Sequence, residues 1–289
     1  MSYVFFGTSS IAALFLRRLI RANMLPTALV TNPDRPAGRK RVLTAPETKR
    51  VILEEGLENK VKIFQPEKPA DIAEALAALA PDLFVVLSYG HILPEPVLAL
   101  PRFGVVGVHP SLLPKYRGPS PIQSVLLAGE SETGVALYKM GEGMDDGPVY
   151  AMEKLAIGDA THDELTAALA DLAARMVADL LPKIASGDVS PVPQSQGEAT
   201  FTRKFTSADG FVDQNDLRAA LAGDAEKSAK IYGKIRAFTP EPGAWTLRNG
   251  LPGEGKRMKL LRAKLDNGKL RLLEVQYEGK KPQKVASSE

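Results

Sequence analysis

The chain has 289 residues, of which 37 are basic and 34 acidic, for a net charge of +3, and 44% of its residues are hydrophobic. This length accommodates two domains with a substantial core, and the apolar fraction is typical of a soluble globular protein. With no cysteine and three histidines, we expect no disulfide, no thiol nucleophile and no metal site. No apolar run approaches about 20 residues and the N-terminus lacks the pattern of a signal peptide, which predicts a cytoplasmic protein without membrane association.

The charge is unevenly distributed along the chain. Residues 203–289 carry 18 basic and 11 acidic side chains, net +7, whereas residues 1–202 carry 19 and 23, net −4. This asymmetry fits a catalytic domain joined to a module that meets a polyanion, although a lysine-rich soluble surface would give the same totals. The segment 186–202 is rich in Ser, Pro, Gln and Gly and is predicted to be a linker between domains at 1–185 and 203–289.

Apolar runs and amphipathic segments alternate through the first 185 residues. The first pair is a strand at Tyr3–Phe6 and a helix at Ile11–Ala22, which Ser9 or Ser10 could cap. Further strands are predicted at Ala28–Thr31, Val61–Gln65, Leu83–Leu87, Val105–Val108, Thr133–Tyr138 and Val149–Met152, and helices at Glu47–Glu55, Pro69–Leu79, Pro119–Ala128 and Asp163–Ile184. The alternation predicts an α/β fold with a mostly parallel sheet and helices on both faces. Residues 32–41, with two prolines and four basic side chains, are predicted to form an exposed loop without regular structure.

Two stretches carry residues suited to chemistry. In GVVGVHPSLLPKYRG (residues 104–118), His109 ends a buried strand before Pro110, at the edge where open α/β sheets bind ligands. In MGEGMDDGPV (residues 140–149), Asp145 lies in a glycine-rich turn, from which a carboxylate can orient an imidazole. Taken singly, a structural histidine and an aspartate that caps its own backbone remain the alternatives.

Taken together, HPSLLPKYRG and MDDGPV, with Asp145 placed 36 positions after His109, resemble the folate-dependent formyltransferase family. The resemblance implies a Rossmann-like catalytic domain, 10-formyltetrahydrofolate as formyl donor, and His109 and Asp145 as catalytic residues. The family's third catalytic residue, an Asn that donates to the formyl oxygen, falls at Gly107, which has no side chain to donate. A water could occupy the space left by that side chain. We therefore expect reduced activity and a gain in turnover from Gly107→Asn.

The same resemblance implies a folate site. The loop SYGHILP (residues 88–94) is similar to the family loop whose backbone binds the pterin, and backbone N–H and C=O groups suit the alternating donors and acceptors of the pterin edge. The residues implied at the folate site are Ser88, Tyr89, Gly90, Ile92, Leu93, Ser111, Leu112, Leu113, Pro114, Gly141 and Asp145.

The basic stretch PDRPAGR (residues 33–39) resembles an insertion with which methionyl-tRNA formyltransferases contact tRNA, and this implies that Arg35, Arg39, Lys40 and Arg41 bind tRNA. Segments 199–213 and 235–245 are similar to other parts of the same proteins. Strands predicted at Lys259–Lys264 and Lys269–Gln276 flank the hairpin turn Asp266-Asn267-Gly268, which favours an OB-like β-barrel as the C-terminal domain.

The resemblance therefore implies a monomeric enzyme of translation initiation that formylates the α-amine of methionyl-initiator tRNA. Three alternatives stay open. They are a small-molecule N-formyltransferase acting on a purine or a sugar, a formyltetrahydrofolate hydrolase, and a catalytically silent protein that binds tRNA or folate.

Overall fold

The computed structural model describes residues 1–38, 41–247 and 255–285 and divides into two compact units. Unit 1 comprises Met1–Pro119, Gly134–Leu155 and Ala167–Phe201, and unit 2 comprises Ser120–Thr133, Ala156–Thr166 and Thr202–Glu289. Most of the segment predicted to be a linker therefore belongs to unit 1. The domain boundaries inferred from composition remain a prediction.

Unit 1 holds an α/β sheet with its helices. The strands are β1 (Tyr3–Phe6), β2 (Ala28–Val30), β3 (Arg35–Ala37), β4 (Val42–Thr44), β5 (Lys62–Phe64), β6 (Leu83–Val86), β7 (Val105–His109), β8 (Glu132–Lys139) and β9 (Val149–Ala156). The helices are α1 (Ser10–Arg21), α2 (Glu47–Glu54), α3 (Ala73–Ala77), α4 (Glu95–Leu98) and α6 (His162–Ser186), with 3₁₀ turns η1 (Pro69–Ile72) and η2 (Gln196–Glu198). Elements β8, β9 and α6 cross the division between the units.

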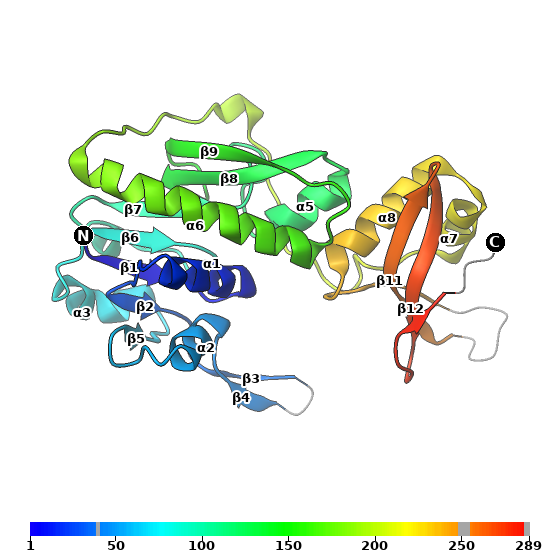
Figure 1. Ribbon diagram of the computed structural model, residues 1–289, viewed down its shortest axis with the longest axis horizontal. Coiled ribbons are helices and arrows are strands. Elements are labelled where there is room, and N and C mark those ends of the chain that lie inside the picture. Colours follow the sequence, from blue (N-terminus) through cyan, green and yellow to red (C-terminus); the bar gives the residue numbers. More distant parts are fainter. Residues whose placement is uncertain (39–40, 248–254, 286–289) are drawn as a thin grey trace. The chain divides into compact units, whose positions relative to one another are not determined.

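The main sheet has seven strands in the order β5-β2-β1-β6-β7-β8-β9. The strands from β5 to β7 run parallel and β8 runs antiparallel to β7. Strands β1, β2, β6 and β7 are buried along their whole length, as expected for parallel strands covered on both faces. Helices α1 and α6 lie side by side along the sheet and are joined by an ion pair between Arg18 and Asp171 (Figure 1). The predicted α/β fold with a mostly parallel sheet is confirmed.

Strand order reverses between β1 and β6, because the chain continues to β2 on one side of β1 and returns to β6 on the other. The loops after these two strands meet at this switch point, where open α/β sheets form their ligand crevices. The Thr8 N–H donates to the Ser88 carbonyl at 3.1 Å, and the Thr8 hydroxyl donates to the Tyr89 carbonyl at 3.2 Å. Ser9 stands at the N-cap of α1 but makes no capping hydrogen bond; its hydroxyl instead lies 2.7 Å from that of Ser88.

The basic segment near residue 35 is more regular than its composition predicts. Arg35–Ala37 pairs with Val42–Thr44 as an antiparallel hairpin, β3–β4, and all six residues are exposed. The prediction of an exposed segment holds, whereas the prediction of no regular element is wrong. Pro36 is tolerated because a two-stranded ribbon consists only of edge strands.

Unit 2 contains α5 (Pro121–Ala128), α7 (Gln214–Ala222), α8 (Ala225–Phe238), β10 (Ala244–Leu247), β11 (Arg257–Asp266), β12 (Lys269–Tyr277) and β13 (Gln283–Lys284). The strands form an antiparallel sheet in the order β10-β11-β12-β13. Asn267 and Gly268 have φ of 50° and 80°, the positive values that a two-residue type I′ hairpin turn requires. The domain predicted as an OB-like β-barrel is found as a small antiparallel β domain with one four-stranded sheet, and helices α7 and α8 are an addition to the prediction.

Helices α7 and α8 belong to the core of unit 2. Leu217 of α7 and Ile231 and Ile235 of α8 share a buried cluster with Leu260 and Leu270 of the sheet. Within the described ranges, no helix has the length and apolar character needed to cross a membrane.

Candidate active site

The site is built on the pairing of β7 with β8. Gly107 lies opposite Tyr138 and His109 lies opposite Ala136 in this antiparallel ladder. Side chains alternate between the faces of a strand and directly opposed residues share a face. Gly107, His109 and Tyr138 therefore face the same side of the sheet at the carboxyl end of β7.

His109 is held in a defined orientation by the loop that follows it. Its side chain is almost fully buried, and its Nε2 lies 2.8 Å from the carbonyl oxygen of Tyr116. Because a carbonyl only accepts hydrogen bonds, Nε2 carries the hydrogen, and Nδ1 is left to face Asp145. The Nδ1 atom can thus accept a proton and, once protonated, pair with a carboxylate.

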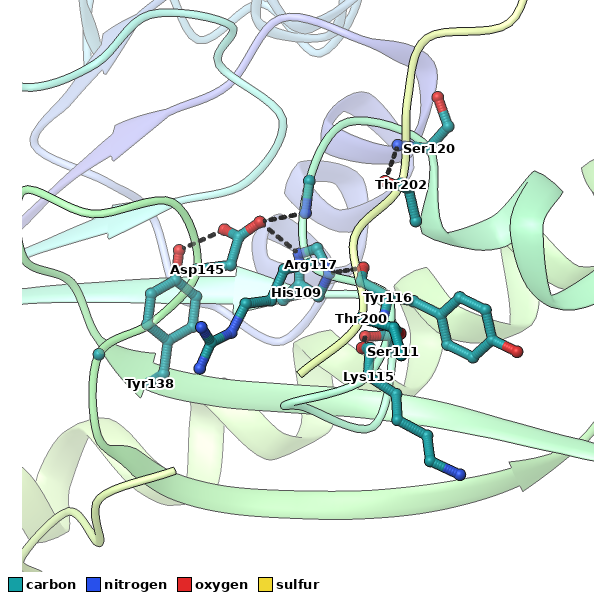
Figure 2. Close-up of polar contacts among 12 residues, drawn as sticks. His109, Ser111, Lys115, Tyr116, Arg117, Ser120, Tyr138, Asp145, Thr200 and Thr202 are labelled. Atoms are coloured by element: carbon teal, nitrogen blue, oxygen red, sulfur yellow. Dashed lines mark hydrogen bonds and ion pairs between the residues drawn. The ribbon is translucent and has the colours of Figure 1, made fainter. Parts of the chain in front are cut away.

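Asp145 lies between His109 and Tyr138 (Figure 2). Its Oδ2 is 3.5 Å from His109 Nδ1 and accepts the N–H of Gly118 at 2.8 Å, while its Oδ1 accepts the Tyr138 hydroxyl at 2.8 Å. Its φ of 51° lies in the left-handed region, which aspartate adopts more readily than most residues other than glycine. The structure thus brings together the two residues that the sequence pairs, and their catalytic roles stay a prediction.

Gly107 leaves no empty space. A Cβ atom built on it would stand 2.3 Å from Cζ, 2.4 Å from Cε1 and 2.7 Å from the hydroxyl oxygen of Tyr138. The phenol therefore occupies the volume in which a side chain at position 107 would begin. The expectation that a water fills this space is wrong, because a water needs room that the ring has taken.

Tyr138 is a site residue that sequence reasoning missed. Its side chain is 2% exposed and shares a buried cluster with Leu113 and Ala136. Burial, and then the neighbouring charge of Asp145, raise the pKa of the Tyr138 phenol well above its ordinary value. The hydroxyl therefore stays a protonated donor. A tyrosine inside an otherwise aliphatic buried strand, whose hydroxyl would need a partner, is the signal that could have identified it.

Gln194 and Arg117 were also missed. The side-chain amide of Gln194 donates to the carbonyls of Asp145 and Gly147 at 2.9 and 2.7 Å, and its oxygen accepts from Nε and Nη2 of the buried Arg117 at 3.1 and 2.7 Å. Gln196 accepts from Nη1 of Arg117 at 3.0 Å. The segment predicted to be a linker thus holds the turn that carries Asp145, and its polar composition gave no sign of this.

The loop predicted to bind the pterin lies at the β1/β6 switch point. Tyr89 and Leu93 point into the core, so their side chains anchor the loop. Ser88, at φ 50°, and Gly90, at φ 90°, are exposed, and Ile92 exposes 79% of its surface. The accessible part of this loop is therefore Ser88, the backbone at Gly90, part of His91 and the apolar side chain of Ile92.

The remaining residues predicted at the folate site fall into two groups. In the loop Ser111–Pro114, the Ser111 hydroxyl donates to the Lys115 carbonyl at 2.7 Å and Leu113 packs against Tyr138, whereas Leu112 and Pro114 are half-buried. Gly141 is exposed, and a Cβ atom there would meet nothing within 4 Å.

Of the residues predicted to bind tRNA, Arg35 and Arg41 are described and exposed, and Arg39 and Lys40 lie outside the described residues. Arg35 pairs with Glu67 at 2.8 Å in an exposed ion pair. Over the described parts of the chain, no group of three or more His, Asp or Glu side chains is arranged to hold a metal ion.

Comparison with known proteins identifies the family of this chain. The family model "Formyl transferase" matches residues 1–181, and "Formyl transferase, C-terminal domain" matches residues 225–270. The chain is 43% identical to methionyl-tRNA formyltransferase of Halorhodospira halophila over 83% of this chain and 74% of that one. It is 36% identical to the enzyme of the same name from Dictyoglomus turgidum over 97% and 93%. Among solved structures, methionyl-tRNA formyltransferase from Clostridium thermocellum has a TM-score of 0.60 at 18% identity, covering 96% of this chain and 98% of that one. The family model that matches residues 1–181 and both sequence relatives show that this chain belongs to the methionyl-tRNA formyltransferase family.

Proposed function

We propose that this protein transfers the formyl group of 10-formyltetrahydrofolate to the α-amine of methionyl-initiator tRNA. The observation that carries the proposal is the His109–Asp145 pair, buried at the carboxyl end of β7 and held by hydrogen bonds on both residues. The tRNA substrate is supported by relatives that match almost the whole chain. Since charged tRNA is made in the cytoplasm, the proposed reaction takes place there. The proposed enzyme is a monomer, because His109 and Asp145 come from the same chain.

The reaction forms a bond between the amine nitrogen and the formyl carbon and breaks the bond from that carbon to N10 of the folate. The amine must lose a proton, N10 must gain one, and negative charge develops on the formyl oxygen. His109 Nδ1 lies 3.5 Å from Oδ2 of Asp145, the carboxylate with which a protonated ring can pair. In this proposal His109 takes the proton of the attacking amine, and Asp145 holds the ring and stabilises the imidazolium.

The loops at the switch point fit a flat ring system with polar edges. At the switch point, Gly90 has open space where a side chain would begin, and the exposed Ile92 offers an apolar surface for a ring to cover. Gly141, in the loop after β8, has open space of the same kind. Two carbonyls of the loop, those of Ser88 and Tyr89, already accept hydrogen bonds from Thr8. Pterin recognition would therefore depend mainly on the backbone beyond Tyr89.

The hairpin β3–β4 fits the tRNA part of the proposal. It carries the exposed Arg35 and Arg41 beside two strongly exposed apolar side chains, Val42 at 60% and Leu43 at 67%. Such a surface is suited to binding the end of an RNA, because the cations can contact phosphates and the apolar groups can pack on a sugar or a base.

The decisive experiment incubates the purified protein with 10-formyltetrahydrofolate and, in parallel, methionyl-initiator tRNA, uncharged tRNA, amino sugars, aminated purine precursors, or water alone. Formylmethionyl-tRNA formed only with the charged tRNA supports the proposal. Formylation of a small amine, or release of formate without an acceptor, would instead establish a small-molecule transferase or a hydrolase. Binding of folate or tRNA with no product in any arm would establish a silent binding protein.

A further inference from the structure

We infer that Tyr138 is a positioning residue of this active site and that Gly107 is glycine because the Tyr138 ring needs its space. The inference rests on the proposed function for its kinetic consequence, while its structural part is independent of any substrate. In this arrangement the phenol hydroxyl holds Asp145 in place beside His109.

The contacts of Asp145 define what the hydroxyl does. Oδ2 is shared between the Gly118 N–H and His109 Nδ1, whereas Oδ1 accepts the Tyr138 hydroxyl at 2.8 Å (Figure 2). Two bonds on opposite oxygens fix the rotation of a carboxylate, and one bond alone leaves it free to turn. Removing the hydroxyl would therefore loosen the oxygen that faces His109.

The ring is positioned for this task by its surroundings. It packs against Leu113 and Ala136 and lies across Gly107 on the neighbouring strand. Its hydroxyl is 2.7 Å from the point at which the Cβ of residue 107 would stand. That is close to the distance between Cβ and the amide nitrogen within an asparagine side chain, so a donor on residue 107 could extend as far as the Tyr138 hydroxyl does, but only if the ring were absent.

Tyr138 differs from a tyrosine that only fills the core. Its single O–H is directed to a carboxylate that also contacts His109, and burial keeps this O–H protonated. The same bond shows that the hydroxyl acts through Asp145, because one O–H cannot at the same time donate to a second acceptor.

The test is Tyr138→Phe, which keeps the ring and removes only the hydroxyl. A hydrogen bond to a charged group contributes about 1.5–3 kcal/mol, so we expect kcat for formyl transfer to fall about 10- to 100-fold. The KM values for folate and charged tRNA should stay within about twofold, since substrate binding does not use this bond. The matched control is Tyr232→Phe, which removes a buried phenol donating to Asp159 at 2.9 Å in unit 2. This control should leave kcat unchanged.

A rescue experiment tests the shared space. Tyr138→Ala should lose at least as much activity as Tyr138→Phe. Adding Gly107→Asn to Tyr138→Ala should restore part of kcat and part of the lost stability, because the amide can then donate to Asp145, whereas adding Gly107→Ala should restore neither. A gain in kcat without a gain in stability would assign the amide to the formyl oxygen instead. Equal kcat for Tyr138→Phe and the parent, or equal effects of Asn and Ala, would overturn the inference. A parent protein that forms no formylmethionyl-tRNA would instead refute the proposed function. Stability measurements on the same variants would then test whether the Tyr138 ring needs the space at Gly107.

Discussion

Gly107→Ala provides the most direct measure of how tightly the site is packed. The added methyl carbon would stand 2.3 Å from Tyr138 Cζ, and a contact below 3.0 Å forces something to move. The ring has little freedom, because Leu113 and Ala136 pack against it and Asp145 holds its hydroxyl. Overpacking costs about 1–3 kcal/mol. Loss of the bond to the carboxylate adds about 1.5–3 kcal/mol.

Alanine has a better intrinsic strand preference than glycine, which offsets up to about 1 kcal/mol. We therefore expect a net loss of about 3 kcal/mol in the free energy of unfolding, which for a unit of this size lowers Tm by roughly 6–12 °C in scanning calorimetry. Gly197→Ala is the matched control, because its φ is ordinary and a Cβ atom there meets nothing within 4 Å. It should change stability by less than about 0.5 kcal/mol.

A double-mutant cycle with Tyr138→Ala identifies the cause of the destabilisation. Once the ring is gone, Gly107→Ala should be neutral or stabilising by up to about 1 kcal/mol. The coupling free energy between the two positions is therefore about 3–4 kcal/mol. If Gly107→Ala is as stable as the parent, or if the two substitutions are additive, the Tyr138 ring does not exclude a side chain at position 107.

Three further outcomes are expected. His109→Ala and Asp145→Asn should each lower formyl transfer by about 10²–10⁴-fold with the circular dichroism spectrum unchanged, and near-parental turnover in either variant would remove its assigned role. Arg35→Gln combined with Arg41→Gln should weaken binding of methionyl-tRNA while leaving folate affinity unchanged. The slope of log affinity against log salt should fall by about one for each phosphate that is no longer neutralised. An unaltered slope would show that the RNA binds elsewhere on the protein. Burial raises the pKa of Tyr89 from 10.0 to about 12, so the unfolded chain releases this proton first and stability should fall as pH rises from about 10 to about 12. In Tyr89→Phe, denaturant midpoints measured across this range should decline less steeply, and an unchanged decline would contradict the assignment.

Much of unit 1 could be predicted because its signals are local. Continuous apolar runs mark buried parallel strands, and Pro110 ends β7 just after His109. The meeting of His109 with Asp145 followed from two motifs at a known spacing. In unit 2, the Asn267-Gly268 turn identified the β11–β12 hairpin from two residues.

The features that the sequence did not predict are of two kinds. Some depend on contacts between distant segments, and others had a local helix-capping signal beside a clearer strand pattern. The encounter of Gly107 with Tyr138 depends on the register of β7 against β8, which neither strand encodes alone. Gln194 acts from a segment whose composition is that of a linker. Helices α7 and α8 did have a local signal, since Asp213 and Asp224 cap them by accepting backbone N–H bonds. The clearer strand pattern that follows them masked this signal.

The crossing of the Tyr138 ring over Gly107 also limits how this site can have arisen. A lineage that begins with a side chain at position 107 cannot gain the tyrosine first, because the two collide, so glycine must come before the tyrosine. The two positions should therefore vary together among natural sequences, with glycine at the first accompanying tyrosine at the second. Sequences that carry a bulky residue at both positions should be rare, and those that carry small residues at both should belong to proteins that have given up the reaction.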